Sequence, residues 1–351
     1  MEEILDRRWF SNDGPVVRDF ERAISRFLGV RHCIITCNGT VALEIATRAL
    51  GLEGEVIVPS FTFVATAHAL QWQGITPVFC DVDPATHNID PLAVEKLVTP
   101  RTTGILGVHL WGRPCAIGAL QEIANRNELA LFLDAAHAFG CGYGGKYIGC
   151  FGRCEIFSFH ATKFLHSFEG GAITTDDDTL ASKARLMRNL GFEGYDNVVS
   201  AGTNGRMTEP CAAMGLTNLE CIDGLVESNR RSYRAYCEGL EGISGIRVVR
   251  YDEKESCNFQ YVVLELDSEA FGTGRDELVD GLQRRGVLAR RYFWPGVHRM
   301  AAYRSRLSEA GPSLPKTEWL AERVVTLPAG TAVDNDEISE ICSIIRRSAR
   351  N

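Results

Sequence analysis

Lysine is scarce in this chain of 351 residues, because only six of its 37 basic side chains are lysines. The basic residues form no stripe of the kind that a nucleic-acid groove needs, and the formal net charge is −8. We therefore expect no nucleic-acid partner. The scarcity of lysine also narrows the search for a reactive amine.

Long apolar runs are absent as well. No stretch approaches the roughly 20 apolar residues of a membrane span, and residues 1–10 lack the apolar core of a signal peptide. We expect a cytoplasmic protein without a membrane partner, in which the twelve cysteines are reduced thiols. The closest cysteine pairs, Cys33/Cys37 and Cys150/Cys154, have no histidine partners at zinc spacing, so no metal is expected.

Short β-branched runs alternate with helical patterns through the first half of the chain. Residues 15–28 carry apolar side chains at helical spacing, with a proline in the first turn and a glycine after the last. This alternation predicts an α/β domain around a mainly parallel sheet. The expected strands are residues 33–36, 55–58, 77–81, 104–109 and 130–134, and the expected helices that follow the first are residues 41–50, 65–73 and 117–127.

The pattern changes after Thr208. Long helical stretches are expected at residues 209–219 and 223–240, then a hairpin-like region at 246–266, then helices at 276–285 and 336–347. This order predicts a smaller α+β domain at the C-terminal end. We place the large domain at residues 1–225 and the small one at 226–351.

Lys163 ends a strand-like run that begins at Phe157 and is followed by Glu169, Gly170 and Gly171. A lysine amine in a partly desolvated site forms a Schiff base with an aldehyde. The alternative is an ordinary solvated lysine, which is what most lysines are.

Asp134 ends the apolar strand at residues 130–134, 29 residues before Lys163. An ionised aspartate beside a pyridine nitrogen keeps that nitrogen protonated, as pyridoxal phosphate (PLP) chemistry requires. A helix cap after the strand is the alternative role. Three interpretations of His137 are open. It could stack near such a ring or form a hydrogen bond with its hydroxyl, or it could be an ordinary histidine of the core.

Two turns are candidates for phosphate binding. Residues 36–40 form a small polar turn before a helix, whose N-terminal N–H groups favour phosphate, and Ser158 could add a hydroxyl. Residues 140–145 are rich in glycine but lack the lysine and hydroxyl residue of a P-loop. An ordinary hairpin is favoured there.

Together these residues resemble the DegT/DnrJ/EryC1/StrS sugar aminotransferases, over nearly the whole chain. Other matching stretches are residues 59–63, 108–112, 202–207 and 327–331. The resemblance implies a fold-type I PLP-dependent transferase, similar to aspartate aminotransferase, with PLP as cofactor. Residues 107–115, 157–163 and 212–217 look most like the branch that aminates carbon 4 of dTDP-4-keto-6-deoxyglucose in desosamine biosynthesis.

The resemblance also implies roles around the cofactor ring. Lys163 would hold PLP through a Schiff base and then act as the general base, Asp134 would pair with the pyridinium, and Phe63 would stack on the ring. His137 would lie beside the ring hydroxyl, and His160 would also contact the cofactor.

The phosphate would be held by Gly39, Thr40 and Ser158. Asn204 matches the residue that family members send across a dimer interface to the partner's phosphate, which implies a homodimer with shared sites. Tyr292 and His298 match a region that lines the sugar-nucleotide pocket. Packing of the small domain is the equal alternative for these two.

The implied reaction is a transamination from L-glutamate to a dTDP-keto sugar, at carbon 4 or, as an alternative, at carbon 3 of a dTDP-3-keto-6-deoxyhexose. A PLP-dependent sugar dehydratase of the same family would carry histidine in place of Lys163. A non-catalytic sensor would be expected to lose Lys163 or Asp134. Both residues are present, which favours the aminotransferase.

Overall fold

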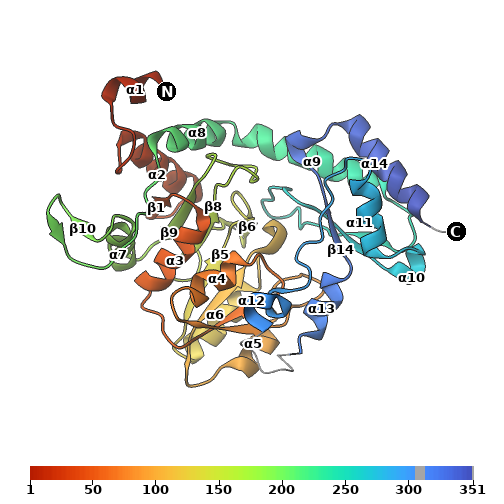
Figure 1. Cartoon of the computed structure of the whole chain (residues 1–351), viewed down its shortest axis with the longest axis horizontal. Coiled ribbons are helices and arrows are strands. Elements are labelled where there is room, and N and C mark those ends of the chain that lie inside the picture. The colour runs from red at the N-terminus through yellow and green to blue at the C-terminus, as the bar shows by residue number, and fades with distance from the viewer. Residues whose placement is uncertain (305–312, 350–351) are drawn as a thin grey trace.

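A seven-stranded sheet lies at the centre of the computed structural model, which describes residues 1–304 and 313–349 (Figure 1). Strand β9 runs antiparallel to both of its neighbours, and the other adjacent strands run parallel. This confirms the predicted mainly parallel α/β sheet. Its strands, in order, are β1 (His32–Thr36), β9 (Gly171–Thr175), β8 (Glu155–Ser158), β5 (Ala130–Asp134), β4 (Thr102–Val108), β2 (Glu55–Pro59) and β3 (Thr76–Cys80).

Helices cover both faces of this sheet because successive strand residues point to opposite faces. Ile35 and Phe157 belong to the apolar cluster on one face, and their neighbours Ile34 and Ile156 belong to the cluster on the other. The first face is covered by α2 (Pro15–Leu28), α5 (Pro91–Leu97), α6 (Ile117–Arg126) and α8 (Glu209–Glu220), and the second by α3 (Gly39–Ala49), α4 (Ala65–Gln71) and α7 (Asp178–Arg188).

A smaller α+β unit lies beside the large sheet, at the right in Figure 1. Its three antiparallel strands and four helices enclose a separate apolar cluster, as the pattern after Thr208 predicts. The strands are β12 (Ile246–Val248), β13 (Val262–Leu266) and β14 (Val324–Leu327), and the helices are α9 (Ile222–Gly239), α10 (Ser268–Phe271), α11 (Arg275–Gln283) and α14 (Asn335–Ser348). The hairpin-like region is confirmed as β12 and β13, although the third strand was not expected.

The chain between β13 and β14 returns to the large sheet. Val297 and Leu314 belong to the apolar cluster on the second face of that sheet. This segment contains η2 (Val297–Arg299), α12 (Ala301–Arg304) and α13 (Pro315–Ala321). The division expected at residue 225 falls in the first turn of α9, and it stays a prediction.

The glycine-rich segment at residues 140–145 forms the hairpin favoured above. Strand β6 (Gly142–Tyr143) pairs antiparallel with β7 (Lys146–Tyr147), and Gly144 and Gly145 have φ of 59° and 75° between them. Positive φ at both central residues is what this tight turn requires. The short remaining elements are α1 (Glu2–Arg7), η1 (Leu110–Gly112), β10 (Phe192–Glu193), β11 (Asn197–Val198) and η3 (Gly330–Ala332).

Among the described residues, no helix has both the length and the apolar character that crossing a bilayer demands.

Candidate active site

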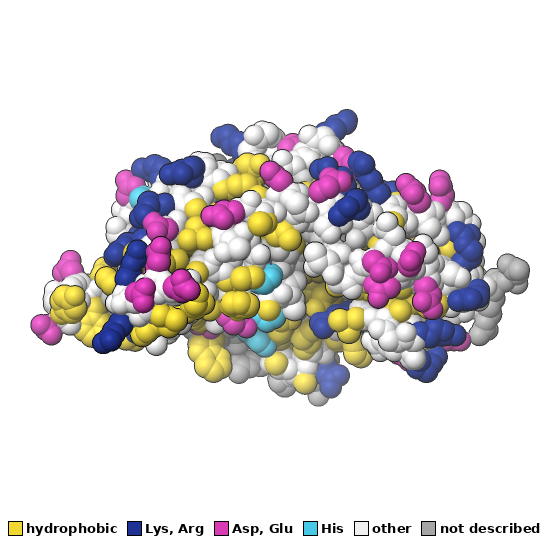
Figure 2. All heavy atoms as spheres, turned by 90° about the horizontal axis from the view of Figure 1, so that it is seen from above, with side chains coloured by type: hydrophobic (Ala, Val, Ile, Leu, Met, Phe, Trp, Pro, Cys, Tyr) yellow, Lys and Arg dark blue, Asp and Glu magenta, His cyan; other side chains and the backbone are white. Residues whose placement is uncertain are grey.

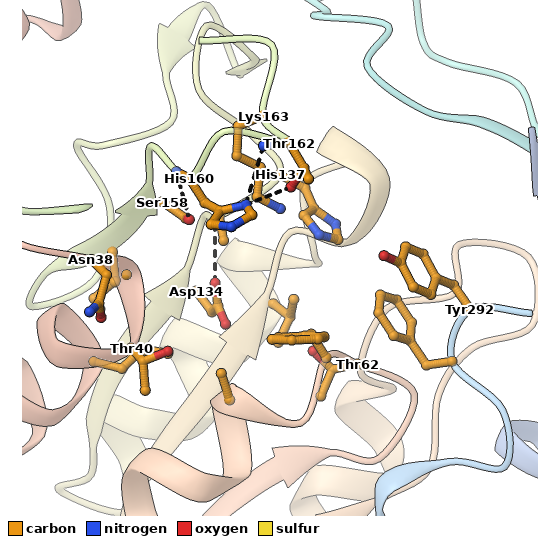
Figure 3. Close-up of a pocket in the computed structure, with 18 of the residues that line it drawn as sticks. Asn38, Thr40, Thr62, Asp134, His137, Ser158, His160, Thr162, Lys163 and Tyr292 are labelled. Atoms are coloured by element: carbon orange, nitrogen blue, oxygen red, sulfur yellow. Dashed lines mark hydrogen bonds between the residues drawn. The ribbon is translucent and has the colours of Figure 1, made fainter. Parts of the chain in front are cut away.

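A cavity of about 590 Å³ opens where the carboxyl ends of β5 and β8 meet the N-terminal end of α3. Ligands of open α/β sheets bind at this edge. Figure 3 shows Asn38 and Thr40 on one side, Tyr292 on the other, and Asp134 and Lys163 between them. Of the predicted site residues, those that line the cavity are Gly39, Thr40, Phe63, Asp134, His137, Ser158, His160, Lys163 and Tyr292.

Lys163 lies in a short turn after β8. Its backbone N–H donates to the carbonyl of His160 at 2.8 Å, and its side-chain Nζ lies 3.4 Å from the hydroxyl of Tyr261. Burial lowers the pKa of the Lys163 amine to about 8, although the nearby charge of Asp134 acts to raise it. A lowered pKa is what a nucleophilic or basic lysine needs, so Lys163 is not an ordinary surface lysine.

Asp134 lies at the end of β5, in which every residue from Leu131 onward is buried. Its Oδ2 accepts a hydrogen bond from the hydroxyl of Thr66 at 2.8 Å, and its Oδ1 accepts one from the N–H of Ala136 at 3.1 Å. Burial raises the pKa of the Asp134 carboxyl, while these two donors and the charge of Lys163 act to lower it. A buried carboxylate of this kind needs a cation beside it.

The N-terminal turn of α3 faces the same cavity. Asn38 caps the helix, because its Oδ1 accepts a hydrogen bond from the N–H of Val41 at 2.8 Å. The N–H groups of Gly39 and Thr40 belong to the first turn, where a helix offers no acceptor of its own. A Cβ at Gly39 would lie only 2.9 Å from the Cβ of Ser158, so only glycine allows this close approach. The backbone and the Ser158 hydroxyl therefore fit a phosphate group.

His137 is buried and also lines the cavity. Its Nδ1 accepts a hydrogen bond from the N–H of Trp111 at 3.3 Å, and its ring centroid lies 4.5 Å from that of Tyr261. Burial and the charge of Lys163 hold the pKa of His137 well below its ordinary value. The ring is therefore neutral, and its hydrogen lies on Nε2, where it is a donor.

Phe63 and His160 lie at more open parts of the cavity. The side chain of Phe63 is 54% exposed, which is unusual for a phenylalanine that lines a cavity. His160 pairs through Nδ1 with the hydroxyl of Thr162 at 2.9 Å, and its Nε2 lies 3.4 Å from Glu169.

Two predicted residues do not line this cavity. His298 is buried, and it makes hydrogen bonds with Ser60 at 2.6 Å and Glu318 at 3.2 Å. His298 therefore links the residue after β2 to α13, and its place in the sugar-nucleotide pocket stays a prediction. Asn204 is exposed, and its Oδ1 accepts a hydrogen bond from Arg206 at 3.0 Å.

Several residues of the site were not predicted individually. Thr66 supports Asp134 from α4, and Tyr261 contacts Lys163 from the position just before β13. Arg290 and Phe293 line the cavity from the segment that returns to the large sheet, and of these two only Phe293 lies within the stretch from Tyr292 to His298 that resembles the family's pocket. No motif joins these positions, because they meet only in three dimensions. Within the described residues, no three histidine, cysteine or acidic side chains gather where they could hold a metal ion.

The chain is similar to known proteins over almost its full length. The dTDP-4-amino-4,6-dideoxy-D-glucose transaminase of Shigella dysenteriae is 37% identical over 346 residues, which are 99% of this chain and 94% of that protein. The GDP-perosamine synthase of Caulobacter vibrioides is 38% identical over 306 residues, which are 86% of this chain and 82% of that protein.

The fold is similar to that of a solved structure, DesI in the presence of its TDP-sugar product. The TM-score is 0.95 at 46% identity, and the match covers 99% of this chain and 88% of that one. This likeness confirms the predicted fold-type I architecture, similar to aspartate aminotransferase. The model of the DegT/DnrJ/EryC1/StrS aminotransferase family matches residues 1–346, and this chain belongs to that family.

Proposed function

We propose that this protein transfers an amino group from L-glutamate to carbon 4 of dTDP-4-keto-6-deoxyglucose, with PLP as cofactor. The product would be dTDP-4-amino-4,6-dideoxyglucose. The observation that carries the proposal is the meeting of Lys163, Asp134 and the N-terminal turn of α3 in one cavity. An amine, a buried carboxylate and a phosphate-type turn are the three groups that PLP needs.

The residues present fit this cofactor. Gly39, Thr40 and Ser158 would hold its phosphate, and Asp134 would pair with its ring nitrogen. The Nε2–H of His137 would donate to its ring hydroxyl. We propose that Phe63, which is exposed at the cavity, stacks on the face of the cofactor ring, and that His160 lies beside the ring.

When bound, PLP supplies an electron sink for charge that develops on the substrate carbon. Lys163 would be its covalent anchor and then the base that carries a proton to and from that carbon. A pKa of about 8 leaves a useful share of the amine neutral near pH 7, as a general base requires.

The choice of substrate rests on the relatives. The DesI structure contains a TDP-sugar product, and the Shigella enzyme is named for a dTDP-4-amino sugar. We propose the same carrier and the same carbon here. Tyr292, on the side of the cavity opposite the α3 turn, is our candidate for contact with the sugar nucleotide.

We further propose a homodimer in which Asn204 reaches the partner's site. Asn204 forms an isolated antiparallel β-bridge with Asn189. Asn189 lies just before the short hairpin of β10 and β11, which exposes large apolar side chains. Figure 2 shows hydrophobic side chains gathered toward the left end of the molecule, where Figure 1 places β10. The exposed fractions are 97% for Tyr195, 58% for Val198 and 48% for Val199. Such a patch favours contact with another chain.

The dimer is tested by complementation. Inactive Lys163→Ala and Asn204→Ala proteins are mixed after mild unfolding and refolding. Hybrid dimers with one intact shared site should regain activity, and the separate variants should not. Light scattering that gives a monomer would contradict the proposal.

The reaction is tested with purified protein. Its PLP absorbance should bleach on addition of L-glutamate, and dTDP-4-keto-6-deoxyglucose should then be converted to an amino sugar identified by NMR. The 3-keto isomer is offered in parallel, and turnover of that isomer alone would refute our choice of carbon. Lys163→Ala should abolish turnover, whereas Lys183→Ala, at an exposed lysine of α7, should not.

A further inference from the structure

Arg290 is a cationic side chain on the cavity for which the proposed reaction gives no role. Its backbone is fixed to β14, because its N–H donates to the carbonyl of Thr326 at 3.0 Å and its carbonyl accepts from the N–H of Thr326 at 2.9 Å. Its side chain lines the cavity together with Lys163. The backbone position of Arg290 is therefore set by the small sheet, while its side chain lines the site.

The guanidinium is held against an aromatic wall. Its Nη1 donates to the hydroxyl of Tyr292 at 2.8 Å, and its Cζ lies 5.5 Å from the centroid of the Tyr292 ring. That ring stacks on Phe293, with centroids 4.7 Å apart, and Phe293 stacks on the buried Trp111 at 5.2 Å. An arginine held by a hydrogen bond and a cation–π contact in this way is partly ordered before a ligand arrives.

Arg290 has no carboxylate partner within 4 Å among the described residues, unlike the next residue along the chain. Arg291 forms ion pairs with Asp276, at 2.7 Å, and with Asp280. The other carboxylates on the cavity are Asp134, which lies close enough to Lys163 to influence its pKa, and Glu169, which lies 3.4 Å from His160. The positive charge of Arg290 is therefore available to a ligand.

We propose that Arg290 binds an oxyanion of a substrate, either a carboxylate of the amino donor or a phosphate of the sugar nucleotide. This proposal rests on the proposed function, since both substrates of that reaction carry such groups. Planar guanidinium N–H groups bind carboxylate and phosphate oxygens through two parallel hydrogen bonds, which a single ammonium cannot match. The wall formed by Tyr292 and Phe293 would leave one edge of the guanidinium for the ligand.

The test compares Arg290→Gln with Arg291→Gln, a matched change one residue away that does not touch the cavity. Binding of dTDP is measured by titration calorimetry on the PLP-loaded protein. The glutamate half-reaction is followed by the bleaching of the cofactor at increasing glutamate concentration. Arg290→Gln should weaken the interaction with one of the two ligands about tenfold or more, equivalent to about 1.4 kcal/mol.

The affected ligand identifies the oxyanion. Weaker binding of dTDP would show that Arg290 binds a phosphate. A higher glutamate concentration needed for half-maximal rate, with the rate at saturation little changed, would show that Arg290 binds a carboxylate. Arg290→Lys should restore part of the affinity, because it keeps the charge but not the planar fork. The proposal is overturned if Arg290→Gln stays within about twofold of wild type for both ligands, or if Arg291→Gln causes the same loss.

These outcomes are separable from a failure of the proposed function. If the wild-type protein does not aminate the keto sugar, the dTDP and glutamate measurements still report on Arg290. If it does aminate the sugar while Arg290→Gln behaves as wild type, only the role of Arg290 is refuted.

Discussion

The reactivity of Lys163 is expected to follow a pKa of about 8, set by burial. At pH 7 about one amine in ten would be neutral, compared with about one in three thousand for a lysine at its ordinary pKa near 10.5. Only the neutral amine attacks an aldehyde. The rate at which cofactor-free protein captures PLP should therefore rise about tenfold per pH unit below 8 and level off above it.

The Asp134→Asn substitution tests in which direction the carboxylate moves the pKa of Lys163. The Asp134 carboxylate raises the pKa of Lys163, so its removal should lower that pKa and move the inflection to lower pH. The substitution keeps the shape of the side chain. The N–H of Ala136 can still donate to an amide oxygen at this position, and the hydroxyl of Thr66 can accept from an amide N–H. A simple loss of structure is therefore not the expected outcome.

The assay is stopped-flow absorbance after cofactor-free protein is mixed with PLP, from pH 5.5 to 10. Lys183→Ala serves as the control for surface amines, since Lys183 is exposed on α7. An inflection above pH 9.5 in the wild type would show that burial does not control the amine. A move to higher pH in Asp134→Asn would refute the electrostatic reasoning.

Three further predictions concern two glycines that other side chains approach closely and one that has open space around it. Gly39→Ala should weaken PLP binding about tenfold or more in an absorbance titration, because its Cβ would press on Ser158 and displace the α3 turn; unchanged affinity would contradict the phosphate role of this turn. Gly215→Ala should lower the free energy of unfolding in urea by about 1–3 kcal/mol, because a Cβ there would lie 2.4 Å from the ring of Phe20. Gly224→Ala, in α9, meets nothing within 4 Å and should stabilise by about 0.5–1 kcal/mol. Equal effects at the two helical glycines would refute the packing argument.

The parts of the fold with local signals could be predicted from the sequence. Helix α2 begins at Pro15 and ends before Gly29 as expected, because proline fits the first turn and Gly29 adopts a φ of 75° that glycine favours. The carboxylate of Asp134 was predictable for a similar reason, since an apolar run that ends in a charged residue marks the edge of a buried strand.

Other parts depend on contacts between distant segments. Strand β14 has four buried residues and no turn signal that ties it to β13, so its pairing was not expected. Helix α7 was also missed, although Asp177 caps it by accepting two N–H groups and could have marked its start. Tyr261 reaches the cavity from the small unit, and nothing in its own neighbourhood of the sequence indicates a site. Arg290 lies two residues before the predicted Tyr292, but no pattern in the sequence shows that its own side chain lines the cavity.

The electrostatics of the cavity explain why these groups favour one kind of ligand. Burial raises the pKa of Asp134 and lowers that of Lys163, so each group is driven toward its neutral form. Their opposite charges act against that trend, because each stabilises the ionised form of the other. If Lys163 loses its charge by bonding to an aldehyde, Asp134 keeps its own charge only beside another cation. An aldehyde that carries a protonated ring nitrogen provides that cation in the same molecule, and the α3 turn favours one that also carries a phosphate.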